Sequence, residues 1–375
     1  MRQTVLQESL SGLRVRCLAC ARRCIIQPGK IGLCRVRTNS DGILKLNSYG
    51  RIAVGHADVI EKKPAYHYRP GSKLLSIGTV GCNWFCDFCI NSELSQSERI
   101  IGERHSPEGV VQLAKQNRCD GIAYTYNEPL IALEYAHDIG MAAHQNGLFN
   151  VIVSNGYGTP EAVDLLSEFA DCVVVGLKAN GSESFLRKHS RVPSSMPIFE
   201  TLSGLKKNNI HIEISDLIIP TLGDSLEQAM TVSRWIVNTL GPDAPIHFVA
   251  YYPASKLSTI PMTPLDVLEA HCEVAANEGL RYVYVANFPG NEHENTYCPN
   301  CKQIAIERFG YDIQAWRLDQ ENKCVNCGYQ LPIIGSKTYT APEERYAPVI
   351  FPPFDLLYVC EGLSSSGEQP PGQLP

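Results

Sequence analysis

The sequence predicts an α/β protein built around a partial (β/α)6 barrel of the TIM type, with a small cysteine-rich, metal-binding segment at each end. Two observations support this prediction. Apolar runs rich in β-branched residues alternate with amphipathic helical patterns in the middle of the chain, and most of the cysteines gather near the two ends. Alternating strands and helices indicate a parallel sheet. An open doubly wound sheet fits the same pattern, and both folds place functional residues at the carboxyl ends of strands.

Composition divides the 375-residue chain into four parts. Residues 1–70 are a cysteine-bearing segment with several turn signals, and residues 71–292 are the barrel. Residues 293–340 resemble a zinc ribbon in their cysteine spacing. Residues 341–375 are an extension with a Pro-, Gly- and Ser-rich tail, which we expect to be disordered.

Six strands and a possible seventh are expected in the barrel. They are residues 73–78, 121–126, 149–155, 172–178, 211–220, 246–252 and, as the possible seventh, 282–288. Three helices carry start signals, because "SPEGVVQLAKQ", "TPEAVDLLSEFA" and "TPLDVLEAHCEVAANEG" each open with a Ser or Thr N-cap followed by proline. The last helix ends on Gly279, as helices commonly do.

Composition also argues against several classes of function. The formal net charge is −6, whereas a nucleic-acid-binding protein normally shows a basic face, so we expect no nucleic-acid partner. No run of 18 or more apolar residues occurs, so no membrane span is expected. The first residues lack the apolar region of a secretory signal. We therefore expect a cytoplasmic protein.

The chain has 15 cysteines, and they are not scattered. Disulfides need an oxidising compartment, whereas tight C-x-x-C spacing in a cytoplasmic chain favours metal binding. We therefore interpret three cysteine groups as metal sites. The groups are Cys17, Cys20, Cys24 and Cys34; Cys82, Cys86 and Cys89; and Cys298, Cys301, Cys324 and Cys327. The isolated cysteines are Cys119, Cys172, Cys272 and Cys360.

The middle group lies directly after the expected strand 73–78 and supplies only three thiols. Soft thiolates favour zinc or iron–sulfur clusters. A structural zinc ion takes four ligands, and a [4Fe–4S] cluster has four irons to ligate. The C-x3-C-x2-C loop therefore leaves one iron open to a small molecule. A zinc site completed by a distant residue is the alternative.

This loop, "CNWFCDFC", resembles the signature of radical S-adenosylmethionine (SAM) enzymes, which follows the first strand of a six-unit β/α barrel. The segments "CLACARRC", "GKIGLC", "YTYNEP", "SNGY", "LIIP" and "FPGNEHENTYCPNC" are similar to the radical SAM component of the AmmeMemoRadiSam group, which is itself similar to pyruvate formate-lyase activating enzymes. The resemblance covers about residues 15–335. It implies a [4Fe–4S] cluster, SAM bound to the open iron, and a one-electron donor such as flavodoxin or ferredoxin.

The resemblance also implies a SAM-binding set at the strand ends. Phe88, just before the third cysteine, would lie near the adenine. Asn127 and Glu128 stand where related enzymes hold the SAM amino group, and Ser154 and Asn155 would face the ribose or carboxylate. A carboxylate suits an ammonium ligand. Ordinary structural roles, a helix N-cap for Asn127 and a turn for Asn155, are the alternatives.

Two further strands offer candidates. Lys178 ends the fourth strand, where the activating enzymes carry Asp-x-Lys, and it belongs to the implied SAM-binding set. Gly176 replaces the Asp, so the monovalent-cation site of those enzymes does not carry over. His247 is near the family position of a histidine that contacts SAM or substrate, although a buried barrel histidine is more often structural. The catalytic residues are not identified, and the candidates are His247, Lys178 and Tyr126.

Cysteine spacing predicts the metal of the C-terminal group but not that of the N-terminal group. Two C-x2-C knuckles separated by 22 residues near the C-terminus predict a four-cysteine zinc site. The four N-terminal thiolates fit either zinc or a second iron–sulfur cluster.

The implied activity is reductive cleavage of SAM to a 5′-deoxyadenosyl radical, which abstracts hydrogen from a small-molecule or protein substrate. A glycyl-radical activating enzyme, which acts on a partner protein, is one alternative. A non-catalytic scaffold that binds zinc or an iron–sulfur cluster is the other.

Overall fold

The computed structural model describes residues 1–338 and 346–350, so most of the expected extension 341–375, including Cys360, lies outside the described residues. The fold is organised around one large sheet with strand order β16-β15-β14-β13-β12-β11-β9-β8-β20. The strands are β8 (Val54–Val59), β9 (Lys73–Gly78), β11 (Gly121–Tyr124), β12 (Phe149–Ser154), β13 (Cys172–Lys178), β14 (His211–Ile218), β15 (Ile246–Ala250), β16 (Val283–Ala286) and β20 (Tyr346–Ile350). The seven strands from β9 to β16 are parallel, and β8 and β20 add an antiparallel edge.

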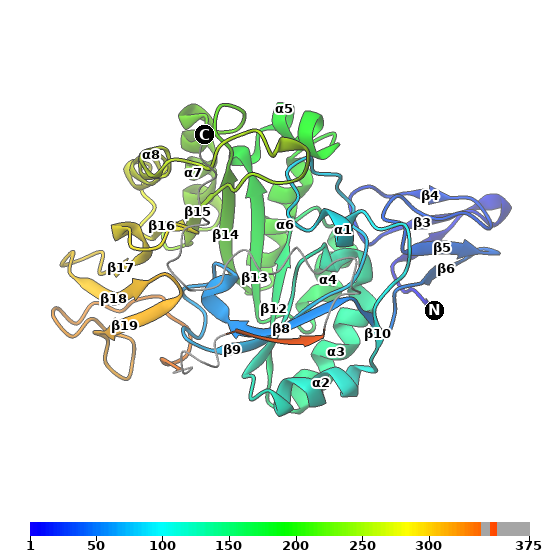
Figure 1. The fold of residues 1–375 in the computed structure, drawn as a ribbon, viewed down its shortest axis with the longest axis horizontal. Coiled ribbons are helices and arrows are strands. Elements are labelled where there is room, and N and C mark those ends of the chain that lie inside the picture. The colour runs from blue at the N-terminus through cyan, green and yellow to red at the C-terminus, as the bar shows by residue number, and fades with distance from the viewer. Residues whose placement is uncertain (339–345, 351–375) are drawn as a thin grey trace, which may run out of the picture.

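The helices cover the sheet in one continuous layer. They are α1 (Ser92–Ser95), α2 (Pro107–Gln116), α3 (Leu133–Gln145), α4 (Pro160–Ser167), α5 (Glu183–Phe185), α6 (Met196–Lys207), α7 (Leu226–Thr239) and α8 (Leu265–Asn277). The parallel strands follow chain order, so right-handed crossovers put the long connecting helices α2, α3, α4, α6, α7 and α8 on the same face. Accordingly α2 contacts α3, α3 contacts α4, α4 contacts α6, and α7 contacts α8. A doubly wound sheet would reverse its strand order. The fold is therefore a partial barrel, which confirms the predicted fold class (Figure 1).

The expected strands appear at the expected places, but the sheet is larger than predicted. Residues 73–78 and 172–178 form β9 and β13 without a change of boundary, and the possible seventh strand is β16. Strand β8 was not predicted, and it lies inside the segment 1–70. It is buried along its whole length and pairs with β9 from Val54↔Gly78 to Val59↔Lys73. The first barrel strand is therefore covered on its outer edge.

Two of the three predicted N-caps form. Ser106 Oγ accepts a hydrogen bond from the Gly109 amide at 3.1 Å, and the Thr159 hydroxyl accepts one from the Ala162 amide at the same distance. The prediction for Thr263 is wrong, because α8 begins after Pro264 without a side-chain cap. The Thr263 hydroxyl instead donates to the Ile218 carbonyl oxygen at 2.6 Å and accepts from the Tyr251 amide at 2.8 Å. It thereby ties the carboxyl ends of β14 and β15 together.

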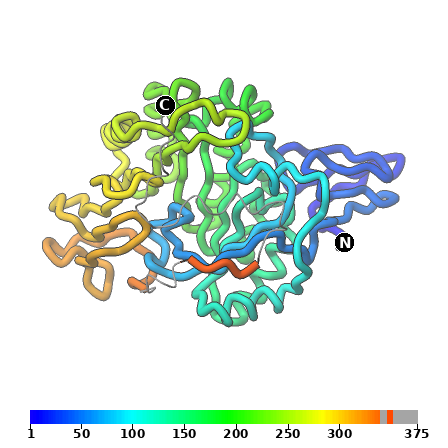
Figure 2. Tube along the Cα trace, viewed as in Figure 1, coloured from blue at the N-terminus to red at the C-terminus, as the bar shows by residue number. Residues whose placement is uncertain are grey.

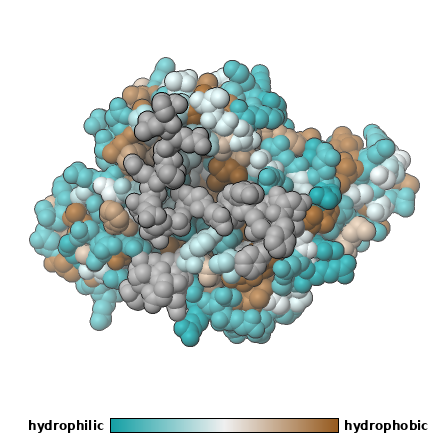
Figure 3. All heavy atoms as spheres, viewed as in Figure 1, coloured by the Kyte–Doolittle hydropathy of each residue, from teal (hydrophilic) through white to brown (hydrophobic). Residues whose placement is uncertain are grey.

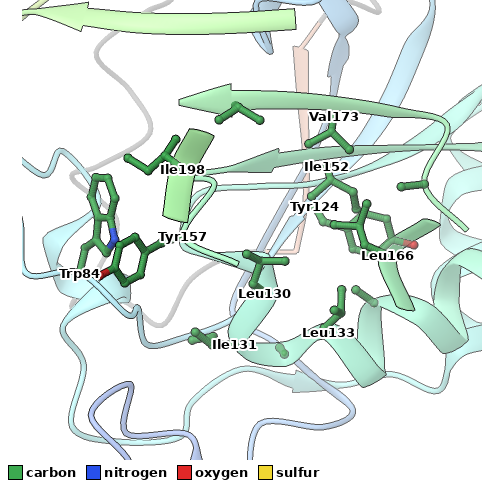
Figure 4. Packing of buried hydrophobic residues seen from close by; sticks show 14 of the residues in the cluster. Trp84, Tyr124, Leu130, Ile131, Leu133, Ile152, Tyr157, Leu166, Val173 and Ile198 are labelled. Atoms are coloured by element: carbon green, nitrogen blue, oxygen red, sulfur yellow. The ribbon is translucent and has the colours of Figure 1, made fainter. Parts of the chain in front are cut away.

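A single large apolar core joins the N-terminal segment to the barrel. Figure 4 shows Trp84, from the cysteine loop, beside Tyr157, which follows β12, with Leu130 and Ile131 nearby. The Trp84 and Tyr157 rings meet edge to face with centroids 6.1 Å apart. The cysteine loop is thus anchored in the core by a large aromatic side chain.

Small antiparallel sheets flank the barrel on opposite sides (Figures 1 and 2). The N-terminal strands are β1 (Arg2–Gln3), β2 (Gln7–Ser9), β3 (Val15–Cys17), β4 (Ile25–Ile26), β5 (Arg37–Ser40) and β6 (Ile43–Leu46). The C-terminal strands are β17 (Thr296–Tyr297), β18 (Ile304–Phe309) and β19 (Asp312–Trp316), and a separate pair joins β7 (Arg51–Ile52) to β10 (Glu103–Arg104). Figure 3, in the view of Figure 1, shows a mostly hydrophilic surface on the face toward the reader, with apolar residues visible in a hollow near the centre. No helix within the described ranges is both long and apolar enough to span a membrane.

Candidate functional site

The three-cysteine loop lies between β9 and α1, at the carboxyl ends of the parallel strands. Each of its thiols has a polar neighbour: the Trp84 amide donates to Cys82 Sγ at 3.4 Å, and hydroxyls of Ser190 and Ser95 lie within 3.4 Å of the other two sulfurs. Burial raises the pKa of all three thiols, that of Cys86 to about 12. Buried thiols of this kind become thiolates when a cationic metal binds them.

The spacing of these thiols fits an iron–sulfur cluster better than a single ion. A tetrahedral zinc ion with bonds of about 2.3 Å holds its sulfur ligands only about 3.8 Å apart. Within the described part of the chain, the three sulfurs belong to no group of ligand atoms that lie within 4.8 Å of one another. A cubane cluster binds each thiolate to a different iron and so needs wider spacing. Three soft donors on one loop, each with a polar neighbour, therefore fit a [4Fe–4S] cluster with one open iron.

Asn127 holds the beginning of the cysteine loop in place. Its side-chain oxygen accepts from the Thr79 amide at 3.1 Å, and its Nδ2 donates to the Thr79 hydroxyl at 3.0 Å and to the Gly81 carbonyl oxygen at 2.9 Å. The N-cap role belongs to its neighbour Glu128, which accepts from the Leu130 amide at 3.0 Å. Asn127 therefore acts on the loop and does not cap the short helix that follows.

Glu128 brings the ends of the second and third parallel strands together. One carboxylate oxygen accepts from the Ser154 hydroxyl at 2.7 Å and the other from the Asn155 amide at 2.7 Å. The Asn155 side chain in turn donates to Asn83 Oδ1 at 2.8 Å, next to Cys82. Burial raises the pKa of Glu128 to about 7, although these hydrogen bonds oppose the shift. The arrangement places a buried carboxyl beside the cysteine loop.

Lys178 extends from the end of β13 back over Gly176. A Cβ atom on residue 176 would lie 3.0 Å from Lys178 Nζ, so the ammonium group occupies space that an aspartate would need. Burial lowers the pKa of Lys178, and the nearby Cys86, Asp216 and Glu128 oppose this shift. The structure thus brings the lysine to the same place as the cysteines and Glu128.

Asp216 is a site residue that was not among the predicted site residues. It is buried near the end of β14, where one carboxyl oxygen accepts from the Asn180 amide at 3.1 Å and the other has no hydrogen-bond partner. Burial raises its pKa to about 7, and Lys178 opposes the shift. The available signal was an acid two residues before the end of β14.

Two aromatic candidates lie close to the cysteine loop. Phe88 is buried, and its ring packs against that of Phe185 at a centroid distance of 5.5 Å. Tyr126 has a left-handed backbone with φ +69°, which a non-glycine residue rarely adopts without a supporting environment. Its ring covers Gly78, where a Cβ would come within 2.9 Å, and its hydroxyl lies 2.8 Å from His56 Nδ1.

His247 is not brought to this group. It is the second residue of β15, three residues before the strand's carboxyl end, and it is fully buried. Its Nε2 lies 2.8 Å from Glu213 Oε2, and its ring stacks on Tyr284 at 4.9 Å. These contacts favour the structural role for His247, at the opposite end of the strands from the cysteine loop.

The C-terminal cysteines form a tight group. All four sulfur atoms lie within 4.8 Å of one another, with 3.5 Å between Cys298 and Cys327 and 3.8 Å between Cys301 and Cys324. Hydrogen bonds from the Asn326 side chain and the Gln303 backbone lower the pKa of Cys301 to about 6. These four thiols are therefore able to bind one metal ion.

Comparisons with known proteins point to one family. The Radical SAM superfamily profile matches residues 76–236. An uncharacterized protein of Methanocaldococcus jannaschii is 36% identical over 337 residues, which is 89% of this chain and 100% of the relative.

Solved structures give weaker likenesses. A domain of pyruvate-formate lyase-activating enzyme from Bacteroides vulgatus has 15% identity and a TM-score of 0.39, covering 44% of this chain and 99% of that one. A radical SAM methyltransferase from Sphaerobacter thermophilus has 15% identity and a TM-score of 0.46, covering 58% and 67%. Streptococcus suis SuiB bound to S-adenosylmethionine has 14% identity and a TM-score of 0.46, covering 61% and 53%. The chain belongs to the radical SAM superfamily, a family of enzymes that use SAM and an iron–sulfur cluster.

Proposed function

We propose that this enzyme binds a [4Fe–4S] cluster through Cys82, Cys86 and Cys89 and, with one electron from an external donor, cleaves SAM to a 5′-deoxyadenosyl radical that abstracts hydrogen from its substrate. The observation that carries the proposal is the convergence of three thiols with Glu128 and Lys178 at the carboxyl ends of the strands. This is the functional end of a barrel of parallel strands.

The charges around the cysteine loop match the methionine end of SAM. That end carries an ammonium and a carboxylate, and the protein offers the buried carboxyls of Glu128 and Asp216 together with the Lys178 ammonium. Charge-assisted hydrogen bonds in a buried site are stronger than neutral ones. In this proposal Glu128 orients the amino group of SAM, and Lys178 provides positive charge for its carboxylate.

The remaining site residues hold the geometry. Asn127 fixes the start of the loop, Trp84 anchors its middle in the core, and the Asn155 side chain links it to the third strand. Phe88 and Tyr126 provide an apolar wall that excludes water from a reactive radical. We do not include His247 in the proposed binding set, because it pairs with Glu213 at the other end of its strand.

The substrate is proposed only as a class, a small molecule or a protein side chain. The Gly176 backbone leaves no carboxylate at the position where the glycyl-radical activating enzymes have one, so that alternative has less support. For the C-terminal cysteine group we propose zinc, because its four sulfurs have the spacing of a single tetrahedral ion. Such a site is structural, since four protein ligands leave no open position.

The test is anaerobic reconstitution followed by addition of dithionite and SAM. We expect 5′-deoxyadenosine to form with the parent protein and not with Cys82→Ala. Lys178→Met should weaken SAM binding roughly tenfold or more by removing a buried charge, whereas Lys206→Met, an exposed lysine of α6, should leave it unchanged. No 5′-deoxyadenosine from cluster-loaded parent protein would contradict the proposal and favour the non-catalytic scaffold.

A further inference from the structure

The four N-terminal cysteines line a cavity beside the cysteine loop. The cavity is small and partly open to solvent, and Asn83 and Arg37 also line it. Cys17 and Cys20 are buried, Cys24 and Cys34 are partly buried, and all four are free thiols. Four thiols, three from residues 17–24 and one from Cys34, therefore line one space, as ligands of a shared metal centre do.

The spacing of these sulfurs is too wide for a preformed single-ion site. The C-terminal group shows what a single-ion arrangement looks like in this chain, with all four sulfurs within 4.8 Å of one another. No three of the N-terminal sulfurs meet that condition. Among the described residues, the N-terminal group is thus like the three-cysteine loop, and unlike the C-terminal group, in having no three ligand sulfurs within 4.8 Å of one another. A centre with several metal atoms spans such a cavity, because each thiolate binds a different metal atom.

Asn83 gives a second, independent sign that the cavity has an occupant. This residue follows Cys82, lines the N-terminal cavity and is fully buried. Its Nδ2 has no hydrogen-bond partner among the described residues, although its Oδ1 accepts from Asn155 at 2.8 Å. Unsatisfied buried donors are rare and costly. The inorganic sulfides and thiolates of an iron–sulfur cluster accept hydrogen bonds, so such a cluster would satisfy this amide.

The cavity also lies directly against the loop proposed to bind the first cluster. A Cβ atom on Gly81 would collide with the carbonyl oxygen of Cys34, which shows how closely the two segments approach. The Arg22 side chain, from the N-terminal group, donates to the Asn83 carbonyl oxygen at 3.0 Å. The N-terminal segment therefore contacts the backbone of residues 81–83, which begin the three-cysteine loop.

Positive charge stands beside the cavity. Arg37 lines it, is almost fully buried and forms a two-pronged ion pair with Glu134 at 3.0 and 2.5 Å. Arg37 also interacts favourably with Cys17 and Cys34 in their ionised forms. A buried guanidinium that faces thiolates stabilises the negative charge of a cluster with four thiolate ligands.

We infer that Cys17, Cys20, Cys24 and Cys34 bind a second iron–sulfur cluster, and not a single zinc ion, in the cavity beside the three-cysteine loop. The inference does not depend on SAM cleavage. Four thiolates leave no iron open to a substrate, so the second cluster exchanges electrons and binds no small molecule. Its position against residues 81–83 places it next to the cluster of the proposed active site.

The test uses the full-length chain with Cys82, Cys86 and Cys89 all changed to alanine, which removes the first cluster. After anaerobic reconstitution we expect roughly four irons and four labile sulfides per chain, with one zinc, and the Mössbauer spectrum of a cysteine-ligated cluster. Adding Cys20→Ala and Cys34→Ala should abolish the iron and leave the zinc. Adding Cys119→Ala and Cys272→Ala, which changes two isolated cysteines, should leave both metals unchanged.

A triple variant without iron but with two zinc ions per chain would overturn the inference, because the N-terminal group would then hold zinc. If the five-alanine variant does not fold, Cys24→Ser in the triple background replaces it, since Cys24 is only partly buried. That variant should alter the Mössbauer signal of the remaining iron, and an unaltered signal would contradict ligation by the N-terminal group. Failure of the parent to form 5′-deoxyadenosine would overturn the proposed function alone.

Discussion

The two ends of this chain each carry four cysteines, but the two groups are built differently. The C-terminal sulfurs are tightly grouped around Cys298 and Cys327, 3.5 Å apart, and Cys327 is exposed. The N-terminal sulfurs are spread around a cavity against the barrel core. An equal number of ligands therefore does not imply the same metal, and spacing and burial carry the distinction.

The two groups also differ in what stabilises the thiolates. Hydrogen bonds from Asn326 and from the backbone lower the pKa of Cys301 to about 6. Burial instead raises the pKa of Cys34 to about 11, with only weak opposition from the Val36 backbone and Arg37. The C-terminal thiols are therefore held in a metal-binding arrangement by hydrogen bonds of their own turns. The environment of the N-terminal thiols is instead set by the packing of their segment against the barrel.

The largest expected effect is the loss of zinc, without loss of iron, when a C-terminal cysteine is replaced. Cys324→Ala should remove zinc and unfold the strands β17–β19, at a cost on the order of 5–10 kcal/mol of metal-coupled folding free energy. Iron content should not change, because β17–β19 lie on the opposite side of the barrel from β3–β6 and away from α1, where the two proposed iron sites lie (Figure 1). Zinc and iron analysis with limited proteolysis of residues 296–333 is the measurement. Loss of iron together with zinc would show that the two ends are not independent.

The next effect probes the charge beside the N-terminal cavity. Arg37→Met leaves Glu134 buried without its partner and should lower the free energy of unfolding by about 3–5 kcal/mol, measured by urea denaturation. Arg317→Met, directly after β19, is the matched change, because its pair with Glu307 of β18 is exposed, and it should cost under about 1 kcal/mol. Equal effects of the two changes would contradict the view that the buried Arg37–Glu134 pair contributes more to stability than the exposed Arg317–Glu307 pair.

A smaller effect tests the close approach of the two cysteine segments. Gly81→Ala adds a Cβ with positive φ against the Cys34 carbonyl, so we expect a loss of roughly 2–4 kcal/mol and reduced iron binding. Gly328→Ala, next to Cys327, has a similar φ of +74° but open space around it. Its cost should be only about 1–2 kcal/mol, from the backbone alone. Denaturant midpoints and iron content of both variants give the comparison, and unchanged iron in Gly81→Ala would weaken the proposed contact.

Local pattern predicted much of the fold and of the site. Strands 73–78 and 172–178 were predicted with their observed boundaries, because apolar β-branched runs end there at turn residues. The same reasoning placed the three-cysteine loop, Glu128 and Lys178 at strand ends, whereas the SAM-binding roles expected for Glu128 and Lys178 came from the resemblance to radical SAM enzymes. All of these placements depend on neighbouring residues in the chain, which is the information that periodicity contains.

The rest depends on contacts between distant segments. Strand alternation indicates the face of a side chain but not its height along the barrel, so the sequence could not decide between the two roles considered for His247. Thr263 has the sequence of an N-cap, yet its hydroxyl binds Ile218 and the Tyr251 amide instead. The arrangement of the N-terminal sulfurs and the unsatisfied Nδ2 of Asn83 result from the packing of the N-terminal segment against the barrel. No local sequence pattern predicts them.

The smallest expected effect concerns two surface ion pairs, one that joins the N-terminal segment to the barrel and one that lies within the barrel. Arg23 forms a two-pronged pair with Glu161 of α4, and Arg281 forms one with Asp243, with side chains 40–44% exposed. Arg23→Gln and Asp243→Asn should each cost under about 1 kcal/mol, less still at high salt, because water screens both pairs. Iron and zinc contents should match those of the parent. If Arg23→Gln instead removed iron, the N-terminal group would be held in place by its surface pair, and the buried contacts at Gly81 and Arg37 would lose their assigned role.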